Sequence, residues 1–277
     1  MDKPKIEKLL TGIQMLDDDV LEGGIPQKHL VMITGTAGTM KSSFAFQMAY
    51  NNVLKGNKAI YVTLEQDATS IITQMQLMGF DLSKIIVKSN NPNVKSILPH
   101  SKDGAVLILL DIGYIRTQEP PSRAGSGLFS WFIHLQTELE KHIKPIPELV
   151  ILDSLTALLH MATPSLEFIA TRGKDLKKDP RFHLISIFDY LKTLKTTTII
   201  INEMPAGILK HSQFGVESYL VDGVLLLAME KRGMEVSRIM QVVKMRYVNH
   251  KTRAYVLKFD NRKATFILRE SQFVKEK

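Results

Sequence analysis

Short runs of consecutive apolar residues recur along the first two hundred positions, and between several of them apolar residues return every three or four positions. Unbroken apolar runs are typical of strands buried on both faces of a parallel sheet, and the three- and four-residue spacing is typical of helices with one buried face. The pattern predicts an α/β fold. Strands are expected at residues 29–34, 59–64, 85–88, 106–110, 149–152 and 196–203, and helices at 43–54, 67–78 and 128–141.

The pattern changes after Gly223, where β-rich segments follow one another with only short turns between them. This arrangement is typical of antiparallel hairpins, so these strands are expected to close one edge of a mainly parallel sheet. The segment at 196–203 would then be the last parallel strand. No linker or repeat is evident, and we expect residues 1–277 to form one domain. The C-terminal strands are expected at residues 224–229, 239–245, 254–259 and 265–268.

Two polar stretches interrupt the apolar pattern. Residues 116–127 are rich in the residue types that form turns, and residues 171–181 are basic. Both are interpreted as exposed loops.

Composition limits the classes of protein that fit. Hydrophobic residues make up 44% of the chain and charged residues 23%, which is ordinary for a globular protein. The longest apolar runs are too short to span a bilayer, and residues 1–8 lack the apolar core of a signal peptide. Cysteine is absent, which excludes disulfides, thiolate zinc sites and cysteine nucleophiles. A cytoplasmic protein with no membrane partner is therefore expected.

Residues 35–42 read G-T-A-G-T-M-K-S and lie between a predicted strand and a predicted helix. This is the context of a phosphate-binding loop, G-x-x-x-x-G-K-[ST]. Glycine lets the backbone turn its N–H groups toward phosphate oxygens, and the helix N-terminus adds partial positive charge. Lys41 would reach the β- and γ-phosphates, and the Ser42 hydroxyl would hold Mg²⁺. The residues predicted to bind the nucleotide are Gly35, Thr36, Ala37, Gly38, Thr39, Met40, Lys41, Ser42 and Ser43.

Met40 departs from this motif, which has glycine before the lysine. If the position requires a positive φ, methionine should cost about 1 kcal/mol or more in backbone strain, whereas a helical φ would cost little. The alternative interpretation of the whole segment is a strand–helix turn that binds nothing. The Lys-Ser pair at the start of the helix favours nucleotide binding.

Three acidic residues follow predicted strands, namely Glu65, Asp153 and Glu203. Parallel strands bring such residues to the same edge of a sheet. Asp153 is predicted to hold Mg²⁺ together with Ser42, directly or through water, and Glu65 to orient or deprotonate an attacking water. Glu203 would sense the phosphate or position water. Asp153 and Glu65 each have an alternative role, which is to cap the helix that follows.

The order of these motifs resembles that of the KaiC-like branch of the RecA/RadA ATPase superfamily. The similarity covers nearly the whole chain. It comprises T-G-I…D…L-x-G-G-I-P, G-T-A-G-T-M-K-S, Y-V-T-L-E, V-I-L-D-S-L-T, T-T-x-I-I-x-x-E, F-G-V-E-S…V-D-G-V and S-R-I-M-Q-V-V-K-M-R-x-x-x-H. The resemblance implies a RecA-like P-loop NTPase core, a mainly parallel central sheet with antiparallel C-terminal strands, and a homo-oligomer.

By this resemblance, ATP would bind between the subunits of a ring, such as a hexamer, or of a filament. Lys244 and Arg246 match a K-x-R pair that reaches the γ-phosphate of the neighbouring subunit. Such a cation contributes on the order of 10³–10⁵ in rate, since it neutralises transition-state charge. The resemblance also puts His250 near the neighbour's nucleotide and Asp260 near its base.

The chain departs from the family pattern in two further places. Gln66 stands where a second acid commonly follows the first, and Tyr247 replaces a glycine after the K-x-R pair. KaiC itself carries two such domains, the second of which phosphorylates itself. Ser218 and Tyr219 fall near the position of its phosphorylated pair, but one serine there is weak support for an autokinase.

Three functions remain open from the sequence. The first is a Mg²⁺-dependent ATPase that acts as an oligomeric regulator, with Lys41, Glu65, Lys244 and Arg246 as catalytic residues. The second is an ATP-binding assembly or signalling module with little hydrolysis and a protein partner, which Met40 and Gln66 favour. The third is a recombinase-like DNA binder, supported by the net charge of +8 and the two polar stretches. Aromatic residues for base stacking are scarce there, so DNA is not the favoured partner.

Overall fold

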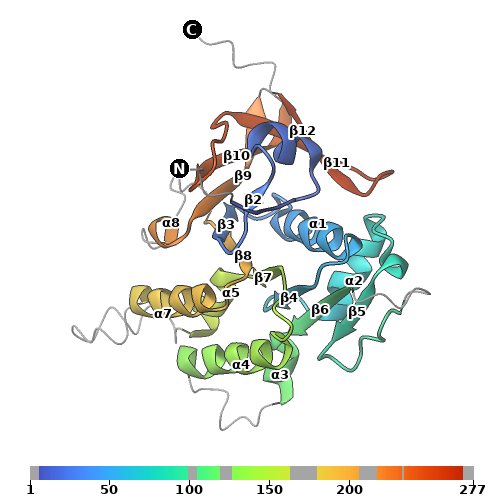
Figure 1. Cartoon of the computed structure of the whole chain (residues 1–277), viewed down its shortest axis with the longest axis vertical. Helices are drawn as coiled ribbons and strands as arrows, with labels where there is room; N and C mark the ends of the chain where they lie inside the picture. The colour runs from blue at the N-terminus through green and yellow to red at the C-terminus, as the bar shows by residue number, and fades with distance from the viewer. Residues whose placement is uncertain are drawn as a thin grey trace.

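Ten strands form the central sheet of the computed structural model, which describes residues 6–98, 105–118, 127–162, 180–205, 217–232 and 234–270. The strands are β3 (Leu30–Gly35), β4 (Ala59–Thr63), β5 (Ile86–Ser89), β6 (Val106–Asp111), β7 (Leu149–Asp153), β8 (Thr197–Glu203), β9 (Gly223–Arg232), β10 (Glu235–Met245), β11 (Ala254–Asp260) and β12 (Thr265–Glu270). Their spatial order is β12-β11-β10-β9-β3-β8-β7-β4-β6-β5 (Figure 1). Each strand predicted from the apolar pattern is present.

Strand β9 joins a parallel half of the sheet to an antiparallel half. It pairs in parallel with β3, with Gly223 opposite Val31, and antiparallel with β10. The prediction that residues 196–203 form the last parallel strand is therefore wrong. The Leu30 N–H donates to the Asp222 carboxylate at 3.1 Å, and the Asp222 N–H donates to the Leu30 carbonyl at 2.7 Å. These bonds hold β9 beside β3, although the paired residues are 192 positions apart. The predicted antiparallel pairing of β9 to β12 is confirmed.

Neighbouring residues of the central strands face two separate hydrophobic cores. In β3, Val31 and Ile33 belong to one core and Met32 to the other, as the alternation of side chains along a strand requires. The first core is completed by α1 (Lys41–Leu54) and α2 (Ala68–Leu77), and the second by α4 (Gly127–His142), α5 (Leu155–Ala162) and α7 (Pro180–Thr193). Figure 1 shows these two groups of helices on opposite sides of the central strands. Because both faces are covered, polar side chains gather at the strand ends.

The helix α3 (Ile112–Gln118) corrects the predicted loop at 116–127, because residues 116–118 are helical. Its start is fixed by Asp111, whose carboxylate accepts from the Tyr114 N–H at 2.8 Å, as in an N-cap. The last residue of that stretch, Gly127, begins the helix α4, and the predicted loop at 171–181 is likewise wrong at Pro180 and Arg181, which begin the helix α7. Residues 119–126 and 171–179 lie outside the described residues, so their assignment as exposed loops stays a prediction.

Short elements complete the fold at its edges. The strands β1 (Lys8–Leu9) and β2 (Ile25–Pro26) pair antiparallel and flank a π-helical turn at Leu16–Val20, and α8 (Glu217–Leu220) precedes β9. Throughout the part of the chain that the structure describes, every helix is too short or too polar to cross a lipid bilayer.

Candidate functional site

The register of four adjacent parallel strands brings the predicted acidic residues to one edge of the sheet. Gly35 at the end of β3 lies opposite Glu203 at the end of β8, and Asp153 at the end of β7 lies opposite Thr63 at the end of β4. Glu65 follows Thr63 by two residues. The prediction that these strands deliver their carboxylates to a common edge is confirmed.

The loop between β3 and α1 contains two residues in the left-handed region. Gly38 has φ +78°, and Met40, the residue before α1, has φ 69° and ψ 31°. The question that the sequence left open is thereby answered: Met40 adopts the conformation that favours glycine. An L-residue there costs about 1–2 kcal/mol, so the chain retains the loop shape in spite of its side chain.

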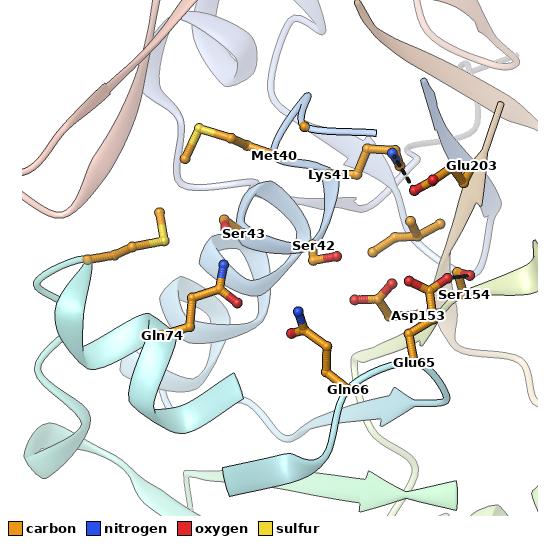
Figure 2. A pocket seen from close by; sticks show the side chains of 13 residues that line it. Met40, Lys41, Ser42, Ser43, Glu65, Gln66, Gln74, Asp153, Ser154 and Glu203 are labelled. Carbon is orange, nitrogen blue, oxygen red and sulfur yellow. Dashed lines mark hydrogen bonds and ion pairs between the residues drawn. The ribbon is translucent and has the colours of Figure 1, made fainter. Parts of the chain in front are cut away.

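Lys41 is turned into this loop. Its ammonium donates to the Thr36 carbonyl at 2.8 Å and lies 3.4 Å from the Glu203 carboxylate, and its side chain is only 6% exposed (Figure 2). The Thr39 hydroxyl donates to the same Thr36 carbonyl at 2.8 Å. A buried cation is thus held at the start of α1, where the helix dipole also favours an anion.

Asp153 is the buried carboxylate of the site. It is 6% exposed, and it accepts from the Tyr61 hydroxyl at 2.5 Å. Burial raises the pKa of Asp153, while hydrogen bonds from the Tyr61 and Ser42 hydroxyls oppose the rise. The alternative role as a helix cap does not apply, since the Ser154 hydroxyl accepts from the Ala157 N–H at 3.1 Å in the first turn of α5. The peptide bond between Asp153 and Ser154 is cis.

Glu65 is the exposed carboxylate of the site, and it accepts a hydrogen bond from the Ser154 hydroxyl. Its alternative role, to cap α2, is taken by Asp67, which accepts from the Ser70 N–H at 2.9 Å. Hydrogen bonds from Ser70 and then Thr69 lower the pKa of Asp67 to about 2. The Glu65 side chain therefore does not cap α2.

One cavity of about 250 Å³ joins these groups. Figure 2 shows Ser42, Asp153 and Glu65 directed toward a common space, with Lys41 and Glu203 on one side and Gln74 on the other. The lining comprises Gly38, Met40, Lys41, Ser42, Ser43, Glu65, Gln66, Gln74, Met78, Asp153, Ser154, Ile201 and Glu203. Sequence reasoning missed Gln74 and Met78, although their four-residue spacing on one helix would have put them on a common face.

Lys244 and Arg246 are not among the described residues that line this cavity. The Lys244 ammonium donates to the Ser218 and Val221 carbonyls at 3.0 and 2.7 Å. Arg246 lies 3.1 Å from the Asp222 carboxylate and is half exposed. Burial, and after it the charge of Arg246, lowers the pKa of Lys244. Both cations thus sit beside the start of β9, where β3 begins, whereas the loop follows the end of β3.

His250 and Asp260 also make contacts within local turns. A ring nitrogen of His250 lies 3.2 Å from the Val248 carbonyl oxygen, within hydrogen-bond distance, and the Asp260 carboxylate accepts from the Arg262 N–H at 2.9 Å. Neither residue lines the cavity as far as the described residues define it.

The arrangement suits the binding of an anion next to a cation. The loop and Lys41 offer positive charge, and Asp153 with Ser42 offers hard oxygen ligands. Among the described residues there is no group of three or more His, Cys, Asp or Glu side chains that could hold a metal ion.

Comparisons with known proteins identify the family and the fold of the chain. The ATPase family model described as KaiC matches residues 9–102 and 129–271. The circadian clock oscillator protein KaiC of Parathermosynechococcus lividus is 25% identical over 257 residues, which cover 92% of this chain and 41% of that protein. A UPF0273 protein of Pyrococcus furiosus is 25% identical over 248 residues, covering 88% of this chain and 87% of that protein.

A solved structure of a KaiC-like protein from the hyperthermophilic archaeon Pyrococcus horikoshii superposes with a TM-score of 0.67 at 23% identity. It covers 95% of this chain and 99% of the other, and it supports the fold. The chain spans about two fifths of the length of the circadian clock relative, at 41%.

Proposed function

The chain belongs to the KaiC ATPase family, and on that premise we propose that it binds ATP with Mg²⁺ and hydrolyses it. The observation that carries the proposal is the convergence of Lys41, Ser42, Asp153 and Glu65 on one cavity. We further propose that residues 1–277 act as a single ATPase domain.

The loop from Gly35 to Ser42 would hold the phosphates. Its backbone N–H groups and the N-terminus of α1 favour negative charge, and Lys41 lies at the base of the loop. On binding, Lys41 would exchange the Thr36 carbonyl and the Glu203 carboxylate for phosphate oxygens. Hydrogen bonds in which both the donor and the acceptor are ionised, as between an ammonium and a phosphate, are among the strong ones in proteins.

Ser42 and Asp153 would hold the magnesium ion. The residues fit, because Asp153 is a buried carboxylate whose pKa is raised by burial, and a nearby dication favours its ionised form. When bound, Mg²⁺ neutralises charge on the phosphate oxygens. The Tyr61 hydroxyl fixes the Asp153 carboxylate in place.

Glu65 would act as the general base. It is exposed to the cavity, and the Ser154 hydroxyl orients its carboxylate, so that it can accept a proton from the attacking water. Gln66 also lines the cavity and would contribute hydrogen bonds without a second negative charge.

Assembly into a ring, such as a hexamer, or a filament would complete the site. Lys244 and Arg246 would come from the adjacent subunit, which is supported by their absence from the described lining of the cavity in their own chain.

Three measurements test this proposal. The purified chain should bind a non-hydrolysable ATP analogue only with Lys41 intact, and it should release phosphate from ATP in the presence of Mg²⁺. Its mass in solution should increase on addition of the analogue. A chain that ignores adenine nucleotides in all three measurements would contradict the proposal.

A second candidate is an ATP-driven assembly module with little hydrolysis. It is favoured by Gln66, which brings an uncharged side chain beside Glu65, and by the left-handed Met40. Nucleotide-dependent assembly without phosphate release above that of the Glu65→Gln variant would establish this function instead. Most of the two polar stretches that suggested DNA binding, namely residues 119–126 and 171–179, lies outside the described residues.

A further inference from the structure

The hairpin of β9 and β10 forms a wall against the phosphate-binding loop. A Cβ atom placed on Gly35 would lie 1.9 Å from the Leu227 carbonyl oxygen, so the β9 backbone presses directly on the first residue of the loop. A Cβ atom placed on Gly38 would lie 3.7 Å from the terminal methyl group of Met229. The hairpin therefore touches the loop at its first residue and again near its tip.

Arg238 makes a polar contact from the same wall. It lies directly opposite Met229 in the β9–β10 register, so the two side chains share one face of the hairpin. The Nε–H of Arg238 donates to the Gly38 carbonyl at 3.2 Å. Arg238 is exposed and does not line the cavity as the described residues define it, so it reaches the loop from the outside.

This contact controls the direction of one peptide group. The bond between Gly38 and Thr39 is trans, and a planar trans peptide points its C=O and N–H in opposite directions. Holding the Gly38 carbonyl toward Arg238 therefore turns the Thr39 N–H away from the hairpin. A cationic donor on the carbonyl also polarises the peptide, which makes its N–H a stronger donor.

We propose that Arg238 is a positioning residue for phosphate binding, which holds the Gly38–Thr39 peptide so that the Thr39 N–H donates to the bound phosphate. The inference rests on the proposed nucleotide site. The contact is needed because Gly38 has no side chain to restrict its backbone, and because left-handed residues at 38 and 40 flank this peptide. In this role Arg238 acts through the loop.

The test compares Arg238→Met, which keeps an unbranched apolar side chain but removes the donor, with Arg238→Lys, which keeps a charged donor. Arg269→Met is the matched control, since Arg269 is an exposed arginine of β12 whose side chain has no hydrogen bond or ion pair with another described residue. Calorimetry measures the Kd of a non-hydrolysable ATP analogue and of inorganic triphosphate, and thermal scans measure the unfolding midpoint.

Arg238→Met should weaken binding of both probes by about threefold to tenfold, the range of one lost hydrogen bond. The effect should appear with inorganic triphosphate, because the Thr39 N–H faces phosphate and not the nucleoside. Arg238→Lys should recover part of the affinity, and Arg269→Met should bind both probes as the unchanged chain does. The midpoint of unfolding should change little in all three variants.

Several results would overturn the inference. Equal weakening by Arg269→Met would mean that only net charge matters, and a loss confined to the ATP analogue would assign Arg238 to the nucleoside. Full affinity in Arg238→Met would remove the role of Arg238 while leaving the proposed function intact. If the unchanged chain bound neither probe, the proposed function would fail as well.

Discussion

The two halves of the sheet use their charged residues in opposite ways. In the parallel half, Asp153, Glu65 and Glu203 stand at or just after strand ends and point into one cavity. In the antiparallel half, Lys244 and Arg246 are bound to carbonyl and carboxylate oxygens of their own chain, away from that cavity. The difference shows that parallel strands place their terminal carboxylates together in one cavity of the chain. The two cations of the antiparallel half lie outside that cavity in their own chain.

The strongest test of this contrast is Arg246→Ala. We expect phosphate release to fall on the order of 10³–10⁵-fold, since the transition state loses a cation from the adjacent subunit. Mixing this variant with Glu65→Gln should restore part of the activity, because some interfaces then combine an intact Glu65 with an intact Arg246. Failure of the mixture to recover activity while both variants assemble would contradict the division of labour between the halves.

Within the parallel half, Glu65→Gln should lower phosphate release by about 10²–10⁴-fold, the usual contribution of a general base. Binding of the ATP analogue should be retained, since the loop and Lys41 are unchanged. Glu235→Gln serves as the control, because Glu235 is exposed on β10 and its side chain has no hydrogen bond or ion pair with a described residue. Unaltered hydrolysis in Glu65→Gln would remove Glu65 from the mechanism.

Backbone strain gives a smaller effect, which urea unfolding can measure. Met40→Gly should stabilise the chain by up to about 1 kcal/mol, because relief of left-handed strain exceeds the entropy cost of glycine. Gly38→Ala should destabilise it by about 1 kcal/mol, since it introduces the same strain at φ +78°. If the two substitutions shifted stability in the same direction, strain would not govern this loop.

The smallest expected effect is a pH dependence that separates Asp153 from the exposed carboxylates. Because burial raises the pKa of Asp153 in the folded state above its usual 3.8, the folded chain binds more protons than the unfolded chain just above that pH. Stability is therefore lost as the pH rises through the folded-state pKa. Asp153→Asn abolishes this loss.

The free energies of unfolding of the Asp153→Asn variant and of the unchanged chain are measured without metal or nucleotide. The value for the variant minus the value for the unchanged chain should increase as the pH rises from 4 to 7, a range that spans the usual carboxyl pKa and neutrality. A difference that stayed constant over this range would show that burial of Asp153 does not set the dependence.

The sequence predicted the parallel half well because each of its strands is buried on both faces. An apolar run followed by an acidic residue, as at Leu152–Asp153, predicts the strand and also the end of the strand that meets the cavity. The same pattern did not reveal that β9 is parallel to β3, because the apolar residues of β9 are compatible with both parallel and antiparallel pairing. The order of strands depends on contacts such as Leu30 with Asp222, which the local pattern does not contain.

Other parts of the site depended on geometry that residue types do not determine. The sequence did not determine the φ angle of Met40, because methionine is compatible with a helical φ as well as a left-handed one. Gln74 and Met78 joined the cavity only through the packing of α2 beside α1. Arg238 lies far from the loop in sequence and reaches it only because β9 and β10 run past it.

The central position of β3 has a consequence for truncation. A protein cut just before Gly223 would lose the strand that pairs with one edge of β3, leaving a mainly apolar strand with a row of unpaired N–H and C=O groups. Exposed edges of that kind template association with other chains. Such a fragment should aggregate even though it would keep every residue of the loop, so the C-terminal hairpins protect the strand from which the loop begins.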